Sequence, residues 1–114
     1  MEEPQVSFSK EQLTVDGVSR QLEHPILDAF AVGQKIIVLY DPDIHREKFG
    51  QFRNLEAFSL DGQKLWTAEL PTNESGDSYY RAYFRDGLMA DSWKSFACKL
   101  DEATGKIQNR AFYK

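Results

Sequence analysis

How this chain can fold is constrained most by its three Asp-Gly pairs, at residues 16–17, 61–62 and 86–87. Such a pair between strand-like runs is a strong hairpin signal, because a type I′ turn needs positive φ at both central residues. With a longer turn, DEATG, they predict hairpins over residues 12–22, 55–70, 79–93 and 96–113. No stretch places apolar residues at sustained helical spacing. The 114 residues are therefore predicted to form one all-β domain, residues 1–114, as an antiparallel meander of about nine strands.

The run IIVLY, Ile36–Tyr40, is apolar at successive positions rather than alternate ones. This pattern is typical of a strand that is covered on both faces, so we place it at the centre of the sheet structure. Alternation along the strands predicts core-facing side chains at Ile36, Val38, Phe58, Leu60, Phe96, Cys98 and Leu100. One short helix remains open as an alternative, within DIHREKFG at residues 43–50.

The chain contains an internal pseudo-repeat, roughly residues 26–70 and 79–114. NLEAFSLDGQKLW in the first part is similar to SFACKLDEATGKIQ in the second, and AFAVGQKIIVLY is similar to AYFRDGLMADSW. The sequence therefore predicts a hairpin followed by two sheet units of four strands each. Two open sheets cannot close into a ring, so we expect them to pack as a sandwich or a flattened barrel.

FSLDGQKLW, residues 58–66, resembles the blade repeat of quinoprotein-like β-propellers, in which a strand ending in Ala-x-(x)-Leu-Asp-x-(x)-x-Gly-Lys leads into a strand carrying Trp. KLDEATGKI has the turn of that repeat, but Gln108 stands where the Trp is expected. The resemblance implies blade-like sheets only. A propeller needs about four to eight blades and this chain holds at most two, so no quinone or other cofactor is carried over.

The 18 Asp and Glu against 14 Lys and Arg give a net charge of −4. A mildly acidic chain repels phosphate backbones and is attracted to basic partners, so nucleic acid is not expected and a basic protein is. The N-terminus lacks a secretory signal pattern, no apolar run could span a membrane, and the single Cys98 excludes an internal disulfide. We therefore expect a cytoplasmic location.

The longest connection lies between Tyr40 and Asn54 and is longer than a hairpin requires. Long loops in compact domains are often functional, and this one combines apolar and charged side chains. It is predicted to contact a partner through Asp43, Ile44, His45, Arg46, Lys48, Phe49 and Phe52. Two alternatives remain. In one, its Phe residues plug the end of the core, and in the other Asp41, Asp43 and His45 bind a metal, although a surface turn explains those three residues more simply.

No catalytic constellation is present. Cys98 fits a core position, and Asp28 and Asp91 are expected to point to water from an outer sheet face. The alternative site is an aromatic pocket lined by Trp66, Trp93, Tyr83 and Asp91. RAYFR, residues 81–85, alternates basic and aromatic side chains as stacking platforms do, but cross-strand packing explains it equally well.

These observations favour a small non-enzymatic protein that binds another protein, with no metal and no cofactor. One concrete class is an immunity or antitoxin-like inhibitor of a basic enzyme. The alternatives are a small-molecule-binding or hydrolytic β protein that uses the aromatic pocket, and a structural module that forms a homodimer through open sheet edges.

Overall fold

The structure is a computed structural model that describes residues 3–45 and 51–112. These residues form eleven strands, one short 3₁₀ helix and no α-helix, which confirms the predicted all-β class. The elements are β1 (Val6–Ser9), β2 (Gln12–Val15), β3 (Val18–Gln21), β4 (Ile26–Val32), β5 (Lys35–Tyr40), η1 (Pro42–His45), β6 (Leu55–Ser59), β7 (Lys64–Thr67), β8 (Tyr79–Phe84), β9 (Leu88–Ser92), β10 (Phe96–Leu100) and β11 (Ile107–Phe112).

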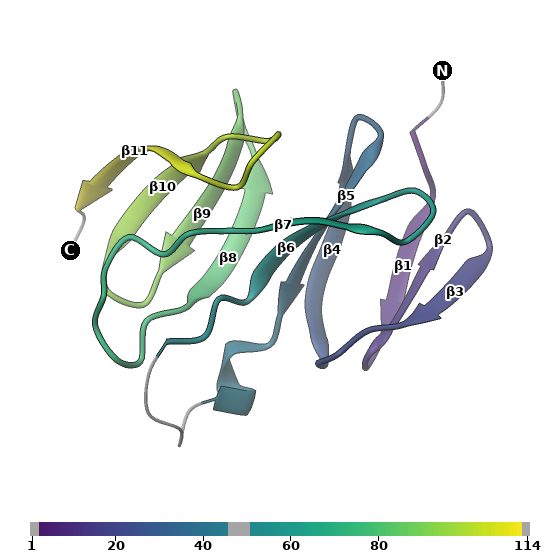
Figure 1. Cartoon of the computed structure of the whole chain (residues 1–114), viewed down its shortest axis with the longest axis horizontal. Helices are drawn as coiled ribbons and strands as arrows, with labels where there is room; N and C mark the ends of the chain where they lie inside the picture. The colour runs from purple at the N-terminus through teal and green to yellow at the C-terminus, as the bar shows by residue number, and fades with distance from the viewer. Residues whose placement is uncertain (1–2, 46–50, 113–114) are drawn as a thin grey trace.

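The strands form three antiparallel sheets in which chain neighbours are also spatial neighbours. Sheet A has the order β1-β2-β3, sheet B the order β4-β5-β6-β7, and sheet C the order β11-β10-β9-β8. The sheets follow one another along the long axis of the molecule, with sheet B between sheet C and sheet A (Figure 1). The Cα extents of 38 × 32 × 20 Å agree with such a stack.

The predicted N-terminal hairpin is part of a three-stranded sheet, because β1 pairs with β2 in the register Val6↔Val15 and Phe8↔Leu13. The sequence does not predict β1, and the structure has eleven strands against the expected count of about nine. The signal is weak in the sequence since VSFS is only four residues long. The turn that follows it contains no glycine and places Lys10 at a φ of 54° instead.

Strand β5 lies in the middle of the molecule, as its sequence predicts, and residues 36–40 are all buried. Ile36, Val38 and Tyr40 belong to the core between sheets A and B. Ile37 and Leu39 belong to the core between sheets B and C, together with Cys98 and Leu100. Sheet B is therefore covered on both faces, whereas sheets A and C each have one face that no other sheet covers.

The turn chemistry follows the sequence closely but not at every pair. Asp16 and Gly17 both adopt positive φ, at 50° and 85°, as a type I′ turn requires. Asp86 and Gly87 also both lie at positive φ. At the third pair only Gly62 does, with a φ of 90°, and Ser59 accepts a bond from its N–H at 3.0 Å. This is a longer turn closed by a left-handed glycine.

Sheets B and C share a local irregularity in their first strands. In β4 the register shifts between Ile26 and Asp28, and in β8 it shifts between Tyr79 and Arg81. A β-bulge of this kind inserts one extra residue and re-aims the side chains around it. In sheet C the extra residue is Tyr80.

The segment for which the sequence left a helix open begins with η1, a single 3₁₀ turn. Residues 46–50 lie outside the described part of the chain.

Candidate binding surface on the outer face of sheet C

The loop predicted to contact a partner can be placed only in part. Asp43 lies in an Asx turn, in which its N–H donates to the Asp41 carboxylate at 2.9 Å, and it is the second residue of η1. Arg46, Lys48 and Phe49 lie outside the described residues, and for Ile44 and His45 only the backbone is described.

Phe52 is not at the surface. It is 8 % exposed and packs in the core between sheets A and B, with its ring 5.1 Å from that of His24. Phe52 is therefore a core residue, as the alternative in which the Phe residues of the loop pack into the core expects.

The four residues of the predicted aromatic pocket do not lie together. Trp66 is 7 % exposed and sits between sheets B and C, where its indole N–H donates to the Glu102 carbonyl at 2.8 Å. The other three residues lie on the opposite face of sheet C. Ala82, Ala90 and Ser92 turn toward sheet B or are buried. Since side chains alternate along a strand, their neighbours Tyr83, Asp91 and Trp93 point away from sheet B. The sequence pattern grouped side chains that the sheet separates.

On that outer face lie two groups of contacting side chains, from β8, β9 and the residue that follows β9. The rings of Tyr80 and Trp93 lie 4.7 Å apart, and the Arg81 guanidinium lies 4.5 Å from the centre of the Tyr83 ring. Arg81 also pairs with Asp91 across the strands at 3.7 Å. We call Tyr80, Arg81, Tyr83, Asp91 and Trp93 the aromatic face.

The exposure of the aromatic face is uneven. Trp93 is 54 % exposed although its ring packs at a tilt against that of Tyr80, and Arg81 is exposed although it contacts Tyr83 and Asp91. Asp91 lies on the outer face as predicted, but it does not point freely to water because it is only 7 % exposed. Asp28, in contrast, is exposed as expected. Burial raises the pKa of Asp91 above its usual value of 3.8, and the Arg81 guanidinium partly opposes that rise.

Replacing Asp91 with asparagine should change how stability depends on pH. A carboxyl whose pKa is raised by folding stabilises the native state only when it is protonated. The native chain should therefore lose stability relative to the Asp91→Asn variant as the pH rises through 3.8 toward the raised pKa. Urea unfolding of both chains between acid and neutral pH measures this difference in the free energy of unfolding. If the native chain instead gains stability relative to the variant as the pH rises, folding does not raise the pKa of Asp91.

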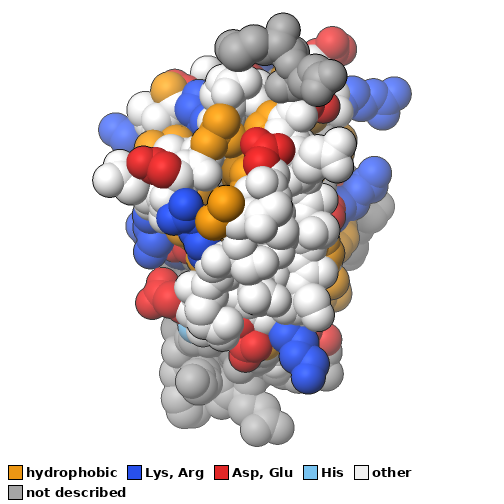
Figure 2. Space-filling view, turned by 90° about the vertical axis from the view of Figure 1, so that its right-hand side faces the viewer, with side chains coloured by type: hydrophobic (Ala, Val, Ile, Leu, Met, Phe, Trp, Pro, Cys, Tyr) orange, Lys and Arg blue, Asp and Glu red, His pale blue; other side chains and the backbone are white. Residues whose placement is uncertain are grey.

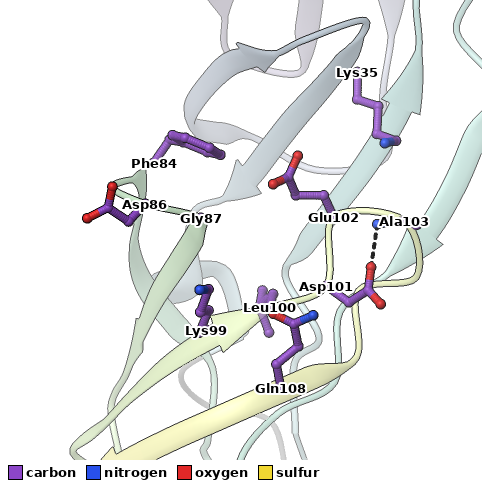
Figure 3. A pocket seen from close by; sticks show the side chains of 10 residues that line it. All are labelled: Lys35, Phe84, Asp86, Gly87, Lys99, Leu100, Asp101, Glu102, Ala103 and Gln108. Carbon is purple, nitrogen blue, oxygen red and sulfur yellow. Dashed lines mark hydrogen bonds between the residues drawn. The ribbon is translucent and has the colours of Figure 1, made fainter.

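A recess of about 460 Å³ lies away from the aromatic face, where hairpin turns of sheet C approach Lys35 of sheet B (Figure 3). It is lined by Lys35, Phe84, Asp86, Gly87, Lys99, Leu100, Asp101, Glu102, Ala103 and Gln108. Half of these residues are charged, and Asp101 is engaged in its own turn, accepting from the Ala103 N–H at 2.8 Å. Ligand pockets are mostly apolar, so this open, charged recess is a weaker candidate than the aromatic face.

Two buried side chains of the types that take part in catalysis, Cys98 and Glu56, have structural surroundings. Cys98 is fully buried, and burial raises the pKa of its thiol, which disfavours the reactive thiolate. The buried Glu56 carboxylate accepts from the Tyr40 and Thr67 hydroxyls, each at 2.9 Å, and pairs with Lys64 at 3.1 Å, so it is fully engaged in structure. Residues 3–45 and 51–112 contain no group of three metal-ligating side chains, and none of their helices has the length and apolar character of a membrane span.

The family model described as a domain of unknown function, DUF7957, matches residues 3–112. The chain belongs to this family. No curated protein and no solved structure matches it, so the blade-like resemblance of its sheets stays a prediction from the sequence. The DUF7957 match spans all three sheets, so the aromatic face lies within the family domain.

Sequence reasoning found Tyr83, Asp91 and Trp93 but assigned them to a pocket, and it treated Arg81 as part of a nucleic-acid alternative. A further signal was present in the charge distribution. Residues 1–78 hold 14 acidic and 7 basic side chains, whereas residues 79–114 hold 4 and 7. The segment that includes sheet C thus carries a net charge of +3 in an acidic chain.

Proposed function

We propose that this domain is a non-enzymatic protein-binding module that docks a partner protein on the aromatic face. The observation that carries the proposal is the exposure of Trp93, which is 54 % exposed at the end of the sheet stack while its ring already contacts that of Tyr80 at an interplanar angle of 40°. Trp, Tyr and Arg are the side chains most often found as binding hot spots.

The aromatic face is also organised before any partner arrives. Arg81 is held by the Tyr83 ring and by the Asp91 carboxylate, and the two strands that carry these residues are hydrogen-bonded to each other. Side chains that are already ordered lose less entropy on association, which favours affinity.

The test compares two exposed aromatic residues of the same sheet. With the partner captured from source cells, Trp93→Ala should weaken binding roughly 30-fold or more, the effect of losing a hot spot of about 2 kcal/mol. Phe84→Ala is the matched control. Phe84 is 52 % exposed on β8, but it pairs with the buried Leu88 and so lies on the other face of sheet C. Titration calorimetry with the purified partner measures both. Equal losses for the two variants, or none for Trp93→Ala, would overturn the proposal.

The charge distribution favours a second candidate. An immunity or antitoxin-like inhibitor of a basic enzyme would use the acidic part of the chain, since residues 1–78 carry a net charge of −7. The affinity of such a complex should fall steeply as salt is added and should not change in the Trp93→Ala variant. The aromatic-pocket alternative has less support, because Trp66 is separated from the other three residues by the sheet itself.

A further inference from the structure

The uncovered face of sheet A has an unusual composition. Leu13 and Val15 of β2 point into the core, so the alternating residues point away from it. Thr14 pairs with Ser7 and Ser19, and Gln12 pairs with Ser9 and Gln21. We call Ser7, Ser9, Gln12, Thr14, Ser19 and Gln21 the neutral face. It contains no charged side chain.

Figure 2 views the molecule from the side on which sheet A lies in Figure 1 and shows a broad area of white, uncharged atoms with charged side chains mainly around it. Exposed sheet surfaces normally carry interspersed Lys and Glu, which also protect against association. Depletion of charge in the centre of a surface is instead a feature of protein interfaces.

The two uncovered faces have complementary properties and lie at opposite ends of the stack (Figure 1). The aromatic face presents Tyr, Trp and Arg, whereas the neutral face presents short hydroxyl and amide side chains. This pairing of rigid aromatic residues with small polar ones is typical of adaptable protein interfaces.

The net charges of the two ends are also opposite. Residues 1–25, which include sheet A, hold five acidic and two basic side chains, a net charge of −3. Residues 79–114, which include sheet C, carry +3. Two copies meeting through equal faces would bring like charges together, whereas a head-to-tail contact brings opposite charges together.

We infer that the aromatic face of one copy docks on the neutral face of a second copy, so that the stack of sheets continues from chain to chain. This inference rests on the proposed function and names the partner as another copy of the chain. Such a contact is heterologous, so association continues beyond the dimer unless a ring closes.

Two variants, each altering one face, test the inference. Trp93→Glu removes the exposed indole and adds a negative charge where the acidic end of the next copy would approach. The double variant Ser7→Lys, Ser19→Lys places two cations on the neutral face, at exposed positions on either side of Thr14. Circular dichroism and thermal melts confirm that both variants fold like the native chain.

Sedimentation velocity and native mass spectrometry then measure association. The native chain should form oligomers that grow with concentration and weaken with added salt. Each variant alone should be monomeric. A mixture of the two, with one isotope-labelled, should form a 1:1 heterodimer that grows no further, because each partner retains the one face that the other has lost.

Three results would overturn the inference. The native chain could stay monomeric over its full soluble range. The lysine variant could still dimerise without rescue of Trp93→Glu, which would show that two aromatic faces pair. Association could also survive both changes, which would indicate pairing through sheet edges. A fourth outcome separates the two proposals. If the native chain is monomeric but binds a different protein, and Trp93→Ala abolishes that binding, the second-copy inference fails and the proposed docking surface stands.

Discussion

Replacing Asn54 with alanine is expected to lower the free energy of unfolding by about 3–5 kcal/mol, since each buried polar group left without a partner costs about 1–3 kcal/mol. Asn54 is completely buried. Its amide donates to the carbonyls of Tyr40 at 2.9 Å and Tyr79 at 2.6 Å, and its oxygen accepts from the Tyr79 N–H at 2.9 Å. One side chain thus joins the end of β5 in sheet B to the start of β8 in sheet C. Alanine would leave all three backbone groups unsatisfied.

Urea unfolding of the native chain and the Asn54→Ala variant measures this difference. Asn73→Ala is the control, because Asn73 is exposed and its loss should change stability by about 0.5 kcal/mol or less. Asn54→Asp should be at least as damaging as alanine at neutral pH, because it would direct a carboxylate at two carbonyl oxygens. If Asn54→Ala behaves like the Asn73 control, the side chain does not hold the two sheets together.

Replacing Gly105 with alanine is the second change with a large expected effect. Gly105 has a φ of 75°, where a residue with a Cβ is disfavoured by about 1–2 kcal/mol. An added Cβ would also lie 2.7 Å from Cδ2 of Trp66, well inside van der Waals contact. Overpacking of this kind costs about 1–3 kcal/mol, so we expect a total loss of about 2–5 kcal/mol in thermal or urea unfolding.

Gly17 provides a matched control for the backbone contribution. Its φ is 85°, but an added Cβ there meets nothing within 4 Å, so Gly17→Ala should lose only about 1–2 kcal/mol. The excess loss at Gly105 should depend on the indole. Combining Gly105→Ala with Trp66→Leu should therefore cost less than the sum of the single changes, by roughly 0.5–3 kcal/mol. Strict additivity would show that the Trp66 ring moves aside without cost.

Local chemistry explains why most strands could be predicted. Asp-Gly pairs and the longer DEATG turn mark chain reversals, and the runs between them are too short and too alternating for helices. The position of β5 was also predictable, because a strand that is apolar at every position must be covered on both sides. The missed β1 shows the limit of this reasoning, since its turn depends on a non-glycine residue, Lys10, at positive φ.

The candidate site was harder to predict from the sequence than the strands were. Alternation shows that Asp91 and Trp93 share a face of their strand, but it does not show which face another sheet covers. The pocket alternative placed Trp66 and Trp93 at one site. In the folded chain one is buried against Gly105 and the other is exposed beside Tyr80.

The sequence by itself determined the all-β class, the hairpins and the central strand, because turn geometry and side-chain alternation depend on neighbouring residues. Only the tertiary structure decided that three sheets stack with sheet B in the middle, that Asn54 joins sheets B and C, and that the aromatic and neutral faces are left uncovered. These features arise from sheet-on-sheet packing between residues far apart in the chain. The period of two within a strand specifies two faces but leaves open which neighbour each of them meets.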